Sequence, residues 1–154
     1  MTTMTARTDA AALELPDVLT FMQELWRVVH GVERASKRMA ASKGITGPQR
    51  LVLRIVGLHP GVSAGALAAT LHVHPSTLTG ILRRLETQGL LRRHAQASDR
   101  RRAVLRLTPR GRRLNRIRQD TIEWRVRAAL RDLTAVERAC VVRALATIAN
   151  HVAT

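Results

Sequence analysis

Glycine and proline interrupt the chain at short intervals between residues 44 and 89, at Gly44, Gly47-Pro48, Pro60-Gly61, Pro75 and Gly89. Proline is tolerated in the first turn of a helix but not in its interior, and glycine favours positions where a helix ends. Between these interruptions apolar residues recur every three or four positions, which is the spacing of one helix face. This part of the chain therefore predicts three short helices. They are at about residues 47–58 with Leu51 on the inward face, 64–71 with Ser63 as the N-cap, and 75–88.

A short β segment follows these helices. Residues 90–95 and 103–107 have the pattern of two strands, and a polar loop, residues 96–102, joins them. In the second strand, Leu105 and Leu107 alternate with positions that would face outward, as expected for a strand with one buried face. The sequence therefore predicts a mainly α fold with one small β-hairpin.

Longer helical patterns flank this central part. One runs from Pro16-Asp17 to about residue 42 and carries a wide apolar stripe. A second begins at Thr108-Pro109 and continues for about 23 residues, a length of ~35 Å for an unbroken helix. The last begins at Thr134, where Glu137 completes a capping box, and extends nearly to Val152.

The charge of the chain is strongly unbalanced. Lys and Arg number 26 against 11 Asp and Glu, which gives a formal net charge of +15. Thirteen arginines lie between Arg83 and Arg118, where the only acidic residues are Glu86 and Asp99. The net charge suits a polyanion, either nucleic acid or an anionic membrane face. Because a solvated surface ordinarily mixes charges of both signs, this segment indicates a nucleic-acid surface, with incidental basicity as the alternative.

Composition also excludes several classes of protein. No apolar run approaches the ~20 residues that cross a bilayer. A single cysteine, Cys140, excludes an internal disulfide framework and a Cys-rich zinc module. Residues 1–15 lack the apolar core of a signal peptide, and we expect them to form a flexible N-terminus. These features together predict a cytoplasmic protein without a membrane segment.

Two helices joined by a tight turn and followed by a basic hairpin describe a winged helix-turn-helix. The DNA major groove admits one helix, and the N-terminal residues of that helix reach the base edges. Arginines at the hairpin tip would enter the adjoining minor groove, with Asp99 bracing the tip, although a solvated loop is the alternative. The candidate DNA-binding residues are Ser76, Thr77, Thr79, Gly80, Arg83, Arg84, Asp99, Arg100, Arg101 and Arg102.

Four sequence motifs follow one another in a familiar order. They are Leu67-Ala68 to Val73, Pro75-Ser76-Thr77-Leu78-Thr79 to Leu85-Glu86, Gly89-Leu90-Leu91-Arg92, and Asp99-Arg100-Arg101 followed by Leu107-Thr108-Pro109-x-Gly111. Through them, residues 45–111 resemble the MarR family of transcriptional regulators. One departure is His72, which stands where a helix-ending glycine is common in that family.

The resemblance implies an obligate homodimer bound to a pseudo-palindromic DNA site. It divides a single domain, residues 16–154, into a winged helix-turn-helix lobe, 45–108, and dimerisation helices, 16–43 with 109–152. The sequence supports this independently, because the apolar stripes of the flanking helices are too extensive to leave in water. In such a dimer the two recognition helices would lie about one turn of DNA apart.

The resemblance also implies that a small lipophilic or phenolic effector releases the DNA. Candidates by position for an effector pocket are Trp26, His30, Arg54, His59 and Trp124. The alternative for the two tryptophans is plain packing in the core or the dimer interface. Cys140 lies on an apolar helix face and is interpreted as structural, and His72 with His74 is too small a set to hold zinc.

The sequence thus predicts a homodimeric, sequence-specific DNA-binding regulator, most simply a repressor, whose partners are double-stranded DNA and a second copy. The rival is a nonspecific architectural DNA-binding protein with the same charge. An enzyme is not expected, because the chain has no Gly-rich phosphate loop and no nucleophile elbow. We expect neither a cofactor nor a metal.

Overall fold

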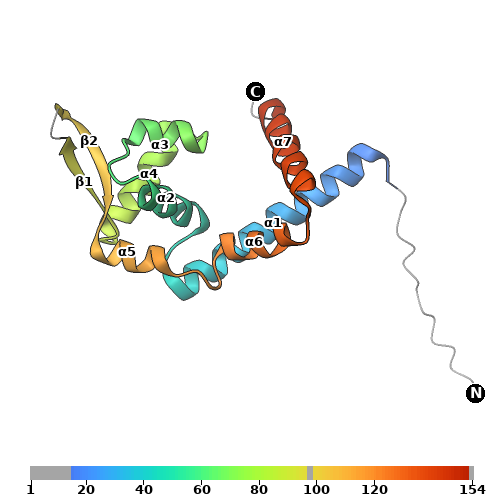
Figure 1. Ribbon diagram of the computed structural model, residues 1–154, viewed down its shortest axis with the longest axis horizontal. Coiled ribbons are helices and arrows are strands. Elements are labelled where there is room, and N and C mark those ends of the chain that lie inside the picture. Colours follow the sequence, from blue (N-terminus) through green and yellow to red (C-terminus); the bar gives the residue numbers. More distant parts are fainter. Residues whose placement is uncertain (1–14, 97–98, 153–154) are drawn as a thin grey trace, which may run out of the picture. The chain divides into compact units, whose positions relative to one another are not determined.

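The computed structural model describes residues 15–96 and 99–152, and of residues 96 and 99–102 it describes the backbone alone. The elements in chain order are α1 (Asp17–Lys43), α2 (Gly47–Leu58), α3 (Ala64–Leu71), α4 (Pro75–Thr87), β1 (Leu91–Gln96), β2 (Asp99–Leu107), α5 (Pro109–Arg116), α6 (Ile122–Arg131) and α7 (Ala135–Val152) (Figure 1). This mainly helical architecture with one β-hairpin confirms the predicted fold class. Within the described ranges, no helix combines the length and apolar character needed to cross a membrane.

The chain forms two compact units, of which one ends at Gly31 and the other begins at Val32. The described part of the first unit is the N-terminal half of α1, where Val18 is 70% exposed and Val28 is 60% exposed. The second unit contains the rest of α1 and every later element. Its α1 segment buries Ala35 and Met39.

One hydrophobic core organises the second unit. It is built by α2, α3, α4 and the β-hairpin, which Figure 1 shows gathered together. Its least exposed members are Ile45, Val52, Leu53, Val56, Leu67, Leu78, Leu82, Leu85, Leu91 and Leu105. The apolar pattern of α2 had suggested that Leu51 faces inward, but Leu51 is 51% exposed, because the buried face of α2 runs through Gln49, Val52, Leu53 and Val56.

Side chains predicted to cap helices do so. Ser63 accepts a hydrogen bond from the backbone N–H of Ala66 (3.1 Å) at the start of α3. Thr134 and Glu137 form the expected capping box before α7, and their hydrogen bonds lower the pKa of the Glu137 carboxyl. His72 ends α3 with φ of 51°, the left-handed conformation for which glycine is usually chosen.

The hairpin is longer than predicted and has an unforeseen neighbour. Strand pairing reaches Gln96 and Asp99 across a register shift at Ala95/Gln96, so assigning all of 96–102 to a loop was wrong. Beside β2, the backbones of Gly61 and Val62 exchange hydrogen bonds with Leu105, each 2.9 Å long. This third, very short extended segment ties the α2–α3 connection to the wing.

The prediction of one long fifth helix that begins at Pro109 is wrong. The chain instead forms α5, which ends at Arg116, and α6, which begins at Ile122. Between them Ile117 is extended and Asp120 has a positive φ of 54°. Thr121 is buried and starts a new helix by accepting the backbone N–H of Trp124 (3.3 Å). The apolar spacing continues across this break, which is why periodicity alone did not reveal it.

Candidate nucleic-acid interface

The first turns of α4 are exposed and leave room for a partner to approach the backbone. Leu78, Leu82 and Leu85 hold one face of α4 in the core. The predicted DNA-binding residues of this helix are all exposed: Ser76, Thr77, Thr79, Gly80, Arg83 and Arg84. A Cβ atom added at Gly80 would meet nothing within 4 Å, so the backbone here presents open space rather than a packed surface.

Local hydrogen bonds fix the first turn of α4. His74 is its N-cap, and the His74 Nδ1 atom accepts the Ser76 backbone N–H (3.3 Å) and lies 2.7 Å from the Ser76 hydroxyl oxygen. The Thr79 hydroxyl donates to the carbonyl of Pro75 (2.8 Å). These contacts set the direction in which the hydroxyl lone pairs point, while both side chains stay exposed to a partner.

The hairpin is attached to α4 by an ion pair at its base. Arg93 of β1 lies 2.8 Å from Glu86 of α4, joining its Nε to the Oε1 oxygen. The hairpin (the wing) and α4 are therefore joined within one lobe. The predicted tip contacts of Asp99, Arg100, Arg101 and Arg102 fall outside the side chains that the structure describes, so those roles stay predictions.

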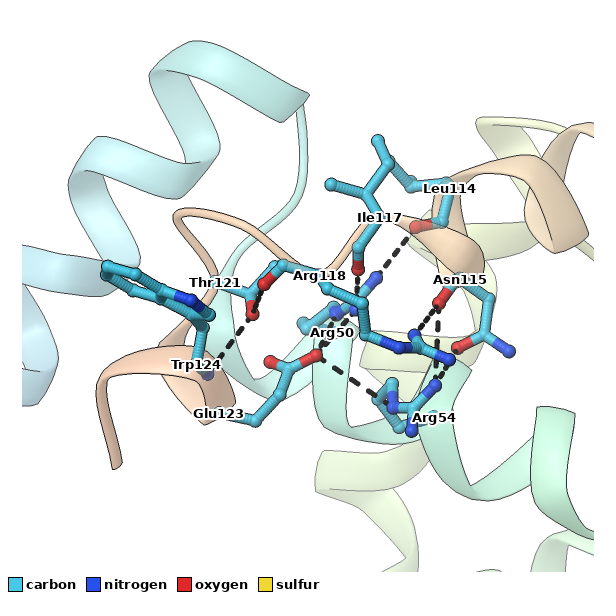
Figure 2. Close-up of polar contacts among 9 residues, drawn as sticks. All are labelled: Arg50, Arg54, Leu114, Asn115, Ile117, Arg118, Thr121, Glu123 and Trp124. Atoms are coloured by element: carbon cyan, nitrogen blue, oxygen red, sulfur yellow. Dashed lines mark hydrogen bonds and ion pairs between the residues drawn. The ribbon is translucent and has the colours of Figure 1, made fainter. Parts of the chain in front are cut away.

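The candidate effector residues are distributed over both units of the chain. Trp26 and His30 contact each other edge to face on α1, with ring centroids 6.2 Å apart, and both are exposed. His59 is exposed at the C-terminal end of α2. Arg54 and Trp124 lie in a separate polar cluster, shown in Figure 2, that joins α2 to the α5–α6 junction.

That cluster centres on Arg50, a residue that the sequence interpretation missed. Arg50 is 2% exposed and donates to the carbonyls of Leu114 (2.7 Å) and Ile117 (2.6 Å). Its guanidinium also forms two hydrogen bonds with one oxygen of Glu123, at 2.8 and 2.5 Å. These bonds satisfy carbonyls left at the end of α5 and attach the first turn of α6 (Figure 2).

Neighbouring arginines complete the junction. Arg54 donates to Asn115 Oδ1 (3.1 Å) and lies 3.8 Å from Glu123, and Arg118 donates to the Asn115 carbonyl (2.6 Å). Burial of Arg54, together with the charges of Arg118 and Arg50, lowers the Arg54 pKa. Burial opposes ionisation of Glu123, but the hydrogen bonds and charge of Arg50 hold the Glu123 pKa below its ordinary value. The only sequence signal was an arginine inside the apolar pattern of α2.

Neither clustered metal ligands nor a buried thiol occurs among the described residues. Within residues 15–96 and 99–152, no three His, Cys, Asp or Glu side chains come together as a metal site. Cys140 is exposed in the single chain, although the sequence had placed it on an apolar face. The Arg143 guanidinium donates to its sulfur at 3.5 Å.

Known proteins match both the sequence and the fold. A family model described as the MarR family matches residues 43–102. The HTH-type transcriptional repressor Rv2887 of Mycobacterium tuberculosis is 33% identical over 95 residues, which cover 62% of this chain and 68% of the repressor. This chain belongs to the MarR family of winged helix-turn-helix regulators. Family membership places it among transcriptional regulators and not among enzymes.

Two solved structures extend the likeness of this MarR-family chain beyond the matched segment. The S. aureus MepR–DNA complex aligns with a TM-score of 0.71 at 20% identity, covering 90% of this chain and 99% of MepR. PcaV of Streptomyces coelicolor, solved with its natural ligand, aligns with a TM-score of 0.69 at 26% identity, covering 91% and 97%. The chain spans only 45% and 46% of the lengths of two other curated regulators that it matches, from Methylorubrum extorquens and Thauera aromatica.

Proposed function

We propose that this chain is a homodimeric, sequence-specific DNA-binding transcriptional regulator, acting in the cytoplasm as a ligand-responsive repressor on a pseudo-palindromic operator. The observation that carries the proposal is the exposed face of α4, from Ser76 to Arg84, held on the same lobe as an arginine-rich wing. The similarity to a transcriptional repressor supports the sense of regulation.

The exposed face of α4 supplies complementary kinds of contact. Hydroxyls at Ser76, Thr77 and Thr79 can donate to or accept from base edges, and Gly80 lets the backbone approach them. Arg83 and Arg84, one turn later, reach a guanine edge or a phosphate with a bidentate guanidinium. The net charge of +15 per chain adds a sequence-independent attraction that weakens as salt is added.

Selection of bound sequences from a random duplex pool tests the proposal directly. We expect enrichment of one motif made of two inverted half-sites whose centres lie about 10 base pairs apart. A pool that stays random after repeated selection, with unchanged affinity, would establish the architectural DNA-binding alternative instead.

Substituting Ser76, Thr77 and Thr79 together by alanine separates base reading from charge. We expect affinity for the selected operator to fall by about 10- to 100-fold and affinity for random DNA to change by less than about threefold, because no cation is removed. The matched control is Thr87→Ala at the other end of α4, also an exposed threonine. Fluorescence anisotropy at fixed salt measures the affinities of the unmodified chain and of both variants for operator and for random DNA. Equal losses on operator and random DNA would contradict sequence-specific reading.

The dimer is proposed from apolar surface that single chains leave in water. On α7, Val142 is 66% exposed and Leu145 is 51% exposed, and α1 exposes a similar stripe. The assignment of residues 16–43 and 109–152 as dimerisation helices, with 45–108 as the DNA-binding lobe, stays part of this proposal.

Sedimentation equilibrium tests the dimer. We expect a mass of twice 17.1 kDa for the unmodified chain, and a shift toward one chain when Val142→Asp and Leu145→Asp place two charges in the interface. Leu51→Asp introduces one such charge at an exposed leucine of α2, outside the proposed interface, and should leave the mass unchanged. A wild-type mass of 17.1 kDa at micromolar concentration would rule the dimer out.

The effector is the least constrained part of the proposal. Its support is the likeness to PcaV, which was solved with its natural ligand, and the surplus of arginine around Glu123 at the α5–α6 junction. Arg54 and Trp124 at this junction are the residues that we retain as candidates, together with Trp26, His30 and His59. Release of the selected operator by a panel of aromatic carboxylates tests it.

A further inference from the structure

A basic cavity lies beside the wing, apart from the DNA-binding residues proposed on α4. Its lining includes Asn115, which also contacts Arg54 in the Arg50 cluster. The cavity has a volume of about 550 Å³ and opens between the C-terminal end of α2, the hairpin and α5. Four arginines line it, Arg92 and Arg106 from the hairpin and Arg112 and Arg116 from α5. Among the described residues that line it, none is acidic.

The backbone places these arginines against one another in like-charged pairs. Arg92 and Arg106 are direct cross-strand partners in the hairpin register. Arg112 and Arg116 are four residues apart on α5 and so share a helix face. Like charges directly across a sheet, or four apart on a helix, destabilise the element that carries them. Two such pairs around one cavity are explained if an anion occupies the space between them.

The cavity is also partly apolar and partly preorganised. Pro60 and Leu107 contribute carbon surface to its lining. Arg112 donates to the Leu107 carbonyl at 2.9 Å, which fixes its guanidinium at the wall before any ligand binds. A bare phosphate or a DNA backbone would gain nothing from the apolar surface, whereas a compact organic anion would bury it.

We propose that this cavity is a binding site for a small organic dianion, with two acidic groups on a flat or compact apolar body. One acidic group would lie between Arg92 and Arg106 of the hairpin, and the other would face Arg112 and Arg116 of α5. Bidentate hydrogen bonds from guanidinium to carboxylate suit this arrangement. The site is independent of the proposed DNA reading, because the dianion would bind the cavity in the free protein.

Calorimetric titration of the full chain without DNA tests the site, with 2,6-naphthalenedicarboxylate as the probe. We expect saturable binding of the dicarboxylate and at least about tenfold weaker binding of both inorganic phosphate and the neutral naphthalenedicarboxamide, which each lack one part of the recognition. Diamide or phosphate that binds as tightly as the dicarboxylate would overturn the proposal. So would no heat of binding at millimolar dicarboxylate.

Matched double substitutions locate the probe. Arg92→Gln with Arg116→Gln should weaken dicarboxylate binding by at least about tenfold, since one cation is removed from each pair. Arg110→Gln with Arg113→Gln removes the same charge from α5, but these residues line a different cavity beside Ile45 and Leu114, and binding should change by less than about twofold. Arg106→Gln alone serves as a second variant, with circular dichroism verifying that each protein folds.

Other outcomes count against the site. Equal weakening by both double substitutions would mean that overall charge, not this cavity, attracts the dicarboxylate. If Arg92→Gln with Arg116→Gln reduced the salt dependence of DNA affinity and left dicarboxylate binding unchanged, these arginines would instead contact DNA phosphates. Failure of the probe to bind leaves the proposed DNA reading intact, because that reading is measured on duplexes with α4 variants.

Discussion

Replacing Arg50 by methionine should destabilise the fold by about 3–5 kcal/mol, the range measured when one partner of a buried ion pair is removed. The loss is expected to be large because Arg50 has only 2% exposure and donates four hydrogen bonds to three acceptor atoms. Methionine fills the space but leaves the carbonyls of Leu114 and Ile117 and the Glu123 carboxylate without their donor. Chemical denaturation with a two-state fit measures the free energy of unfolding.

A double substitution distinguishes this buried pair from simple packing. Arg50→Met combined with Glu123→Leu removes both charges, and we expect it to recover part of the stability lost by Arg50→Met alone. Arg50→Lys is the conservative control and should still lose stability, since one ammonium group cannot reach two carbonyls and a carboxylate in this geometry. If the stability lost by Arg50→Met and by Glu123→Leu separately summed to the loss of the double variant, the two side chains would contribute nothing as a pair.

The pH dependence of stability should also report the ion pair between Arg50 and Glu123. The Glu123 pKa is lower in the folded chain than in the unfolded chain, so the unfolded chain takes up the proton first as pH falls. This contribution is complete above the ordinary carboxyl value of about 4.3 and is lost as pH falls through the lower, folded value. In Glu123→Gln that part of the acid dependence should be absent. The lowered pKa of Glu137 is common to both proteins and cancels in the difference.

Local sequence rules predicted the elements that such rules govern. Pro75, Ser63 and the Thr134–Glu137 box mark helix starts through their own backbone chemistry, and the structure places helices after each of them. Helix spacing also indicates which face of α4 is buried, because Leu78, Leu82 and Leu85 recur every three or four residues and leave the opposite side exposed. These signals need no knowledge of distant residues.

Features set by distant contacts were not predicted. The break between α5 and α6 depends on Arg50, a residue 64 positions before the Leu114 carbonyl that it binds. The extended segment beside β2 consists of two backbone groups at Gly61 and Val62, which no side-chain pattern announces. In the sequence, the arginines of the basic cavity are simply part of one run of positive charge. The strand register is what shows that Arg92 and Arg106 lie opposite each other.

The tightest of these long-range contacts concerns Gly111, which lies in the first turn of α5 against the base of the wing. A Cβ atom at this position would lie 1.9 Å from the Leu90 carbonyl oxygen and 2.9 Å from its carbon. Both atoms are backbone, and the same carbonyl accepts the N–H of Thr108 (3.1 Å). Thr108 in turn donates to the Gly89 carbonyl (2.7 Å) and caps α5 by accepting the Gly111 N–H (3.0 Å). No rotamer change can relieve this contact.

Gly111→Ala should therefore destabilise the chain by about 3 kcal/mol, at the upper end for overpacking, because α5 must move away from the wing. Gly65→Ala is the matched control, since a Cβ atom there meets nothing within 4 Å in helix α3, and we expect it to be neutral or to stabilise by up to ~1 kcal/mol. Thermal and denaturant unfolding measure both. If the free energy of unfolding of Gly111→Ala lay within about 0.5 kcal/mol of that of the unmodified chain, α5 would be free to shift on the wing. The close packing of α5 against Leu90 would then not be what fixes the base of the wing.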